Sequence, residues 1–434
     1  MSLRVSDMVE GASGSIYEVT STIASGGFGA TFFVTEKNSG SEFVAKSPTQ
    51  IDKTRMDSLR IEYNVLKDLE SHGVTGVMRA VDLIEFDSPN GKFPVLVLER
   101  ARGITLQDAC MKQGISYDDT SDIIQKIAET MAEVHSSGYM HLDIAPDNIF
   151  IDDLGGSNEI TIIDFGIAAR KSDTSTFAVD QHGMNKPFFG APEQREVPPQ
   201  ASQRSDIFSL GCVGFCLVLG YEKTVHDIAG NQGKPPPYDL EKHTPPGTIP
   251  STDAHLNDVI KKATWPSKDG RFCTMQEMCD AILGKEPDTN YHRIVADNKV
   301  YPLKGDGPWK IGREQFQHKP DIVVKDKAIT HKYLSREQAY IERRKDGVLL
   351  LHHTGKNETR VKVGQGSNTR WNIVKEGGPG YPLGSRYQEI CFGYCDVPPS
   401  GAFDEHGNPM VPGPYKTIEF QPPGDPSSTI VTTG

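Results

Sequence analysis

The sequence predicts two domains of different secondary structure, an α+β domain followed by an all-β sandwich. Its 434 residues exceed what one compact core usually holds. The first part mixes strand-like runs with helical repeats, in which Ile123, Ile127 and Met131 recur on one face. Later in the chain, short β-rich runs alternate with Gly and Pro turns, which is typical of a sandwich. We therefore expect a first domain, a linker, a second domain and a tail, at 14–284, 285–294, 295–422 and 423–434.

The net charge is distributed unevenly along the chain. From Asn290 onward, 20 Lys and Arg face 16 Asp and Glu, a net +4, so the remainder carries 26 against 42, a net −16. This acidic first part argues against nucleic acid as a partner.

No segment predicts secretion or membrane association. The N-terminal residues MSLRVSDMVEG lack an apolar core, and the longest apolar stretch, 207–221, is shorter than a bilayer requires. The seven cysteines include no CxxC pair, so packing is favoured over zinc or disulfides. We expect a cytoplasmic location.

The stretch 141–166 gathers side chains suited to chemistry. Asp143 and Asn148 lie five residues apart on a turn-rich loop, and Asp164 follows two β-rich runs joined by a Gly-Gly turn. Such a hairpin would bring both ends of the stretch to one cleft. Asp143 could then orient a hydroxyl, while Asn148 and Asp164 hold Mg²⁺ or Mn²⁺. The alternative is two unrelated Asp-rich turns.

These residues resemble the catalytic and metal-binding loops of the protein kinases, whose pattern is HRDxxxxN…DFG. The glycine-rich run 23–34 resembles the kinase flap over nucleotide phosphates, since β-type residues rather than a helix follow it. Ala24 replaces the usual first glycine. Lys46 matches the lysine of the VAIK motif, and Glu62 would be its ion-pair partner on a helix. The resemblance implies that ATP is bound by Ile23, Gly26, Gly27, Gly29, Thr31, Ala45, Lys46, Leu98, Glu99 and Ala101.

Three further landmarks follow in kinase order. Residues 191–193 resemble the Ala-Pro-Glu motif that ends the activation segment, and Arg271 resembles the arginine that pairs with Glu193. Asp206 resembles the aspartate that anchors the catalytic loop, and we also expect it to cap the helix beginning beside it. The resemblance spans residues 16–283 and implies the two-lobed α+β protein kinase fold.

The five groups that act in phosphoryl transfer are all present: Lys46, Glu62, Asp143, Asn148 and Asp164. The resemblance therefore implies an ATP- and Mg²⁺-dependent serine/threonine protein kinase that acts on protein substrates. One alternative is a small-molecule phosphotransferase, which shares the Asp-x4-Asn loop. The other is a pseudokinase scaffold that binds nucleotide and phosphoproteins.

Three positions depart from the kinase pattern. Leu142 replaces the arginine that receives a phosphorylated loop residue, so loop phosphorylation should not switch the enzyme by that route. Ala145 replaces the lysine that neutralises the transferred phosphate. We hypothesise that Lys186 is a further catalytic residue that restores this charge beside Asp143, and a solvent-facing lysine is the alternative.

The second domain has about eight β-rich runs and three loop motifs: Gly-Arg at 312–313, Ser-Arg at 335–336, and Asn357. They resemble the forkhead-associated (FHA) domain, a sandwich that binds phosphothreonine peptides. The resemblance implies that Arg313, Ser335 and Arg336 lie at the phosphate, and that Asn357 holds the peptide backbone.

Two departures affect this domain. Gln338 replaces the usual histidine of the SxxH motif, and KNET replaces SxNGT. Because that histidine mainly supports the loops, the fold should persist. The alternative to phosphothreonine binding is a purely structural sandwich, or one with a different partner. The Pro- and Gly-rich segment 398–414 is expected to be an insertion between the last two strands.

A hydroxyl-rich loop suggests how the two domains cooperate. Thr174, Ser175 and Thr176 are candidate autophosphorylation sites, and the FHA-like domain could bind the phosphorylated loop in cis or, through a homodimer, in trans. The alternative is that this domain recruits substrates already phosphorylated by another kinase.

Overall fold

A computed structural model of the chain divides into two compact units, 1–285 and 286–434. In the first unit the structure describes residues 3–11, 14–25, 29–89, 91–166, 169–170, 188–196, 201–225, 237–244 and 255–285. In the second it describes 291–297, 299–305, 307–313, 320–324, 335–345, 348–356, 358–363, 370–383, 388–393 and 415–421.

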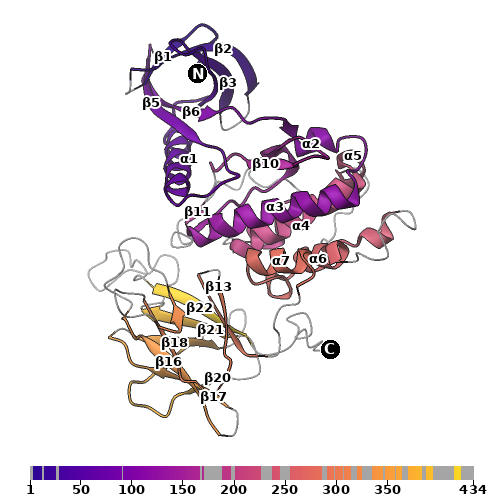
Figure 1. The fold of residues 1–434 in the computed structure, drawn as a ribbon. Helices are drawn as coiled ribbons and strands as arrows, with labels where there is room; N and C mark the ends of the chain where they lie inside the picture. The colour runs from indigo at the N-terminus through magenta and orange to yellow at the C-terminus, as the bar shows by residue number, and fades with distance from the viewer. Residues whose placement is uncertain are drawn as a thin grey trace. The chain divides into compact units, whose positions relative to one another are not determined.

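The first unit begins with a six-stranded antiparallel sheet, in the order β1-β2-β3-β4-β6-β5, beside the helix α1 (Figure 1). Burial alternates along β3, as expected of a half-buried strand. The side chain of Asp52 caps α1 by accepting the N–H of Arg55 at 3.0 Å. The elements are β1 (Met8–Glu10), β2 (Ile16–Ser25), β3 (Ala30–Glu36), β4 (Glu42–Ser47), α1 (Lys53–Ser71), β5 (Ala80–Ser88) and β6 (Gly91–Glu99).

Residues before position 14, where we placed the start of the first domain, belong to this sheet. Strand β1 pairs with β2, and Leu3 is buried in the same core as Val9 and Val34. The N-terminal residues therefore contribute to the stability of the sheet.

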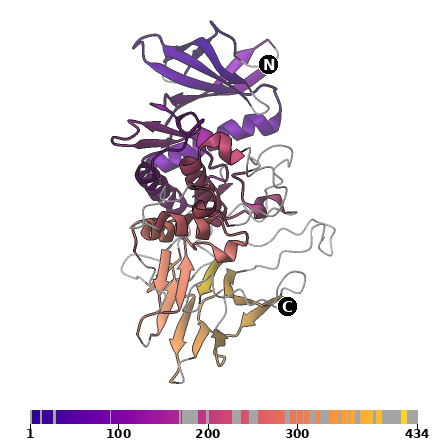
Figure 2. The same cartoon turned by 90° about the vertical axis from the view of Figure 1, so that its right-hand side faces the viewer.

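The remainder of the first unit is mainly helical, as both views show (Figures 1 and 2). Helix α3 begins after the cap Ser116 and buries Ile123, Ile127 and Met131 completely, as its periodicity predicts. Helix α4 is buried along nearly its full length, and most of its residues from Ile207 onward are apolar. The helices are α2 (Leu106–Ala109), α3 (Tyr117–Ser136), α4 (Gln203–Leu219), α5 (Tyr221–Lys223), α6 (His255–Ala263) and α7 (Met275–Ile282).

Short elements complete this part of the unit. They are β7 (Ile104–Thr105), β8 (Tyr139–Met140), η1 (Pro146–Asn148), β9 (Ile149–Asp152), β10 (Glu159–Ile162), β11 (Ala169–Arg170), η3 (Pro192–Arg195), η5 (Leu240–Lys242) and η6 (Lys268–Gly270), where η marks a 3-10 helix. Across the described residues of the whole chain, every helix is too short or too polar to span a bilayer.

The described residues of the second unit form two sheets, in the orders β13-β12-β22-β21-β18-β19 and β15-β14-β16-β17-β20. Ile294 and Phe420 of one sheet share a core with Ile311 and Ile341 of the other, so the described residues form a sandwich. The strands are β12 (Arg293–Ala296), β13 (Lys299–Pro302), β14 (Trp309–Gly312), β15 (Ile322–Val323), β16 (Ala339–Arg343), β17 (Leu349–His353), β18 (Thr359–Val363), β19 (Arg370–Val374), β20 (Tyr381–Leu383), β21 (Gln388–Gly393) and β22 (Tyr415–Gln421).

The sequence predicted about eight strands in this unit and missed three of those that the structure shows. Strand β12 begins inside the stretch expected to be a linker, and β19 and β20 were not recognised. β12 has only four residues, β19 carries Arg, Trp and Asn, and β20 contains Pro, so none shows a clear alternation.

Candidate active site

A β-hairpin brings the two ends of the stretch 141–166 together, as the sequence predicted. Strands β9 and β10 pair antiparallel, with Ile149 opposite Ile162. One step further, the N–H of Ile163 donates to the carbonyl of Asn148 at 2.9 Å. Asn148 and Asp164 therefore lie at the same open end of the hairpin.

The side chain of Asn148 fixes the orientation of Asp143. Its Nδ2 donates to the backbone carbonyl of Asp143 and to Oδ2 of the same residue, both at 2.9 Å. Because the amide nitrogen is used in this way, the amide oxygen Oδ1 is the atom suited to a cation. Together with the carboxylate of Asp164 it forms the oxygen donor set that Mg²⁺ prefers, so these residues fit the metal.

Lys46 lies between two carboxylates from different elements. Its Nζ is 2.6 Å from Oε1 of Glu62 on α1 and 3.2 Å from Oδ1 of Asp164. Burial tends to lower the pKa of Lys46, but the two carboxylates outweigh it and raise that pKa well above its ordinary value. Conversely, the charge of Lys46 lowers the pKa of Asp164. Lys46 is therefore cationic and Asp164 anionic at neutral pH.

Additional contacts hold the Asp164 backbone, which has φ of +66°. The hydroxyl of Ser58 on α1 donates to the carbonyl of Gly166 at 2.9 Å, so the helix that carries Glu62 also holds this segment. Phe165 is fully buried, with its ring 4.6 Å from that of His141. Sequence reasoning missed Ser58, because a serine within a helix carries no pattern that points to a remote carbonyl.

Several of the residues predicted to bind the base and phosphates lie on the strands of the six-stranded sheet. Ala45 and Leu98 are buried on the neighbouring strands β4 and β6, where Val44 lies opposite Leu98. Thr31 on β3 lies opposite Lys46, and Ile23 on β2 is exposed. A Cβ at Gly29 would lie 2.9 Å from the carbonyl oxygen of Ser47, so this close approach needs glycine.

The remaining predicted nucleotide contacts are less well defined. Glu99 is exposed, and its N–H already donates to the carbonyl of Arg79 at 3.0 Å, while Ala101 is half-buried. A contact from Glu99 to a base would therefore come from its carbonyl. Gly26 and Gly27 lie outside the described residues.

Asp206 anchors the catalytic loop from helix α4. Its two oxygens accept the backbone N–H of His141 at 2.9 Å and that of Leu142 at 2.7 Å, and it lies 2.8 Å from Nε2 of His135. Our prediction that Asp206 caps α4 was wrong. Ser202 is the cap, because it precedes the first helical residue and accepts the N–H of Arg204.

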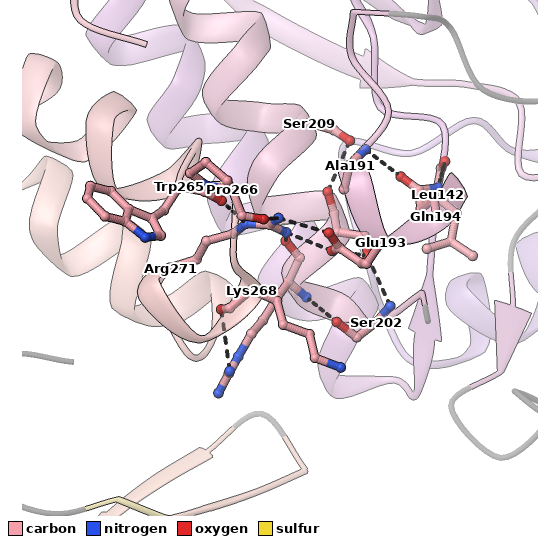
Figure 3. Close-up of polar contacts among 12 residues, drawn as sticks. Leu142, Ala191, Glu193, Gln194, Ser202, Ser209, Trp265, Pro266, Lys268 and Arg271 are labelled. Carbon is pink, nitrogen blue, oxygen red and sulfur yellow. Dashed lines mark hydrogen bonds and ion pairs between the residues drawn. The ribbon is translucent and has the colours of Figure 1, made fainter. Parts of the chain in front are cut away.

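A buried ion pair links residues far apart in the sequence (Figure 3). Nη1 and Nη2 of Arg271 lie 2.7 and 2.8 Å from the two carboxylate oxygens of Glu193, and the hydroxyl of Ser205 also donates to Glu193. The carbonyls of Trp265 and Pro266 accept from the same guanidinium. Burial opposes ionisation of Glu193, but Arg271 outweighs it and lowers the pKa of the carboxyl. The predicted Arg271–Glu193 pair is thus confirmed.

Comparison with known proteins agrees with this geometry. Residues 17–271, more than half of the chain, match the family model described as the protein kinase domain. The chain belongs to the protein kinase family. The probable serine/threonine-protein kinase PknB of Corynebacterium glutamicum is 28% identical over 291 residues, covering 62% of this chain and 42% of that protein. The serine/threonine-protein kinase PknB of Mycolicibacterium smegmatis is 27% identical over 224 residues, covering 49% of this chain and 34% of that protein. The chain therefore matches less than half the length of each of these relatives.

The departures from the kinase pattern have a local explanation. Leu142 is buried against Met140, with Ala201 packed nearby, so the position normally taken by arginine lies in an apolar environment. Ala145 is also completely buried. Lys186, Thr174, Ser175 and Thr176 lie outside the described residues.

In the second unit, Arg313, Ser335 and Arg336, three of the predicted phosphopeptide residues, lie at one set of loops. The N–H of Arg313 donates to the carbonyl of Ser335 at 3.2 Å, and the hydroxyl of Ser335 accepts the N–H of Lys356 at 3.0 Å. A Cβ at Gly312 would lie 1.8 Å from the carbonyl oxygen of Arg336, so only glycine permits this approach. Asn357 lies outside the described residues.

The buried residue Gln338 is hydrogen-bonded to these loops. It is fully buried, and its Oε1 accepts the N–H of Ser335 at 3.1 Å. Its backbone N–H and carbonyl bond to Ile311 and to the 354–355 segment. Gln338 therefore links the segment at Ser335 to the segment 354–355.

Proposed function

We propose that this chain is an ATP-dependent serine/threonine protein kinase. The observation that supports it most is the linkage of Lys46 to both Glu62 and Asp164, beside an Asp143 oriented by Asn148. This arrangement joins strand β4, helix α1 and the hairpin in the way that phosphoryl transfer requires. Protein substrates are favoured over small molecules because the buried Glu193–Arg271 pair stabilises a lobe of the kind that docks polypeptides.

Each side chain has a defined task in this proposal. Asp143 orients the acceptor hydroxyl and accepts its proton as the oxygen attacks the γ-phosphorus, and ADP is the leaving group. Lys46 aligns the α and β phosphates, and Glu62 holds Lys46 in place. Asn148 and Asp164 would hold Mg²⁺ or Mn²⁺, which supplies charge neutralisation at the phosphates when bound.

Labelled-ATP incorporation tests this function. Wild type is expected to phosphorylate a Ser/Thr peptide library and its own residues Thr174, Ser175 or Thr176, while Asp143→Asn loses about 10²- to 10⁴-fold in rate. Phosphosite mapping by mass spectrometry shows which residues react. Nucleotide binding without transfer by wild type would instead indicate the scaffold, and transfer to small metabolites alone would indicate the small-molecule phosphotransferase.

We further propose that the second unit binds phosphothreonine peptides in the manner of an FHA domain. Arg313 supports this, because its Nε is buried and has no hydrogen-bond partner among the described residues. A buried guanidinium nitrogen without a partner is costly, and a phosphate would satisfy it. The hydroxyl of Ser335 lies on the same loops, where it accepts the backbone N–H of Lys356. Such binding would serve substrate recruitment or recognition of the autophosphorylated loop, in cis or in a homodimer.

Binding of fluorescent phosphothreonine peptides to the full chain tests this second function. The peptides include the sequence around Thr174 and Thr176, with unphosphorylated and phosphoserine versions for comparison. We expect Arg313→Ala to weaken phosphothreonine binding about tenfold to a hundredfold. Arg344→Ala, an exposed arginine of the same unit, should leave it unchanged. Equal binding of phosphorylated and unphosphorylated peptides would contradict the proposal.

A further inference from the structure

We propose that Gln194 is a positioning residue that links the polypeptide-docking segment to the catalytic aspartate; this inference rests on the proposed kinase activity. Gln194 lies in η3 and uses both ends of its side chain (Figure 3). Oε1 accepts the N–H of Ala191 at 2.8 Å, which closes the first turn of η3. Nε2 donates to the carbonyl of Leu142 at 2.9 Å, across 52 positions of sequence.

The contact from Gln194 restrains Leu142, whose backbone conformation is unusual. Its φ is +66°, a left-handed conformation that non-glycine residues adopt only when their surroundings stabilise it. The N–H of Leu142 is held by Asp206 at 2.7 Å, and its carbonyl is held by Gln194. Two side chains from different elements therefore restrain both polar groups of this residue.

The peptide group that joins Leu142 to Asp143 is held at both of its polar atoms. Its carbonyl accepts from Gln194, and its N–H, which belongs to Asp143, contacts Nδ1 of His141 at 3.2 Å. A peptide fixed at both atoms cannot rotate without losing a hydrogen bond. Its plane sets the direction in which the side chain of Asp143 leaves the backbone. Gln194 thus acts on the reaction through Asp143.

The same side chain couples substrate docking to catalysis. Gln194 follows Glu193 directly, so the buried pair with Arg271 fixes one end of the link and the catalytic loop fixes the other. Leucine at position 142 offers no cation to a phosphorylated loop residue. The neutral amide of Gln194 instead provides a connection that does not depend on phosphorylation.

Two substitutions separate this role from simple capping of η3. Gln194→Glu keeps an oxygen to accept the N–H of Ala191 but places a carboxylate oxygen against the carbonyl of Leu142. Gln194→Met keeps the length and loses both hydrogen bonds. Gln276→Glu is the matched control, because Gln276 is exposed on α7 and its side chain donates to Asp280 of the same helix.

The measurements are kcat and KM for peptide and for ATP, thermal unfolding, and hydrogen exchange of the backbone at 139–148. We expect both Gln194 variants to lose roughly tenfold to a hundredfold in kcat, with KM for ATP unchanged, because Asp143 is misoriented. ATP hydrolysis without peptide should fall by the same factor. Exchange at 139–148 should accelerate, while Gln276→Glu behaves as wild type.

Wild-type kcat in Gln194→Glu, or a change confined to KM for the peptide, would overturn the inference. If wild type itself transfers no phosphate, it is the kinase proposal that fails. Hydrogen exchange then decides the inference alone: faster exchange at 139–148 in Gln194→Glu supports the link, and unchanged protection refutes it.

Discussion

Lys46→Met should reduce kcat/KM for ATP-dependent phosphorylation about a thousandfold. The substitution removes the cation that lies 2.6 Å from Glu62 and 3.2 Å from Asp164. Methionine matches the length and apolar stem of lysine, so the packing around β4 persists. Glu62 is then left as a buried carboxylate without its partner, and Asp164 loses the charge that lowers its pKa.

A matched control and a second variant sharpen this prediction. Lys67→Met removes a half-buried lysine of α1 that pairs with Glu70, and it should leave the rate unchanged. Glu62→Gln should lose less than Lys46→Met, because Lys46 keeps Asp164 as a partner. Near-wild-type kcat/KM in Lys46→Met would show that this lysine does not align the phosphates. The proposed mechanism would then be wrong at its first step.

The parts of the site that depend on short-range pattern could be predicted from the sequence. Lys46 lies near the end of strand β4, Glu62 lies on a periodic helical face, and a Gly-Gly turn marks the hairpin between β9 and β10. Each of these patterns is set by neighbouring residues, since alternation and helical periodicity decide which face is buried. The order of the kinase-like motifs along the chain then indicated which of these segments belong to one site.

Contacts between remote polar side chains could not be predicted in the same way. Ser58 and Gln194 contact backbone carbonyls that lie 108 and 52 positions away, and neither residue belongs to a charge pattern or an apolar face. The error at Asp206 has the same origin. An acidic residue near a helix start suggests a cap, yet tertiary packing buries Asp206 beneath the catalytic loop and leaves the cap to Ser202.

Arg271→Met should destabilise the first unit by about 3–5 kcal/mol, the typical cost of breaking a buried ion pair from one side. Arg271 is completely buried, and its guanidinium donates to both oxygens of Glu193 and to the carbonyls of Arg204, Trp265 and Pro266. Removing it leaves the carboxylate of Glu193 buried with only Ser205 as a side-chain donor among the described contacts. Denaturant unfolding, followed by a signal of the first unit, measures the loss.

The dependence of this loss on pH identifies its cause. Arg271 lowers the pKa of Glu193 in the folded state, so the pair stabilises the fold fully above the unfolded glutamate pKa of about 4.3. That stabilisation is lost as pH falls through the lowered folded value. The difference in unfolding free energy between wild type and Arg271→Met should therefore shrink on acidification. Arg60→Met, which breaks the exposed pair with Glu85, should cost less than about 1 kcal/mol. A loss for Arg271→Met as small as that control would show that the bridge contributes no more than a surface contact.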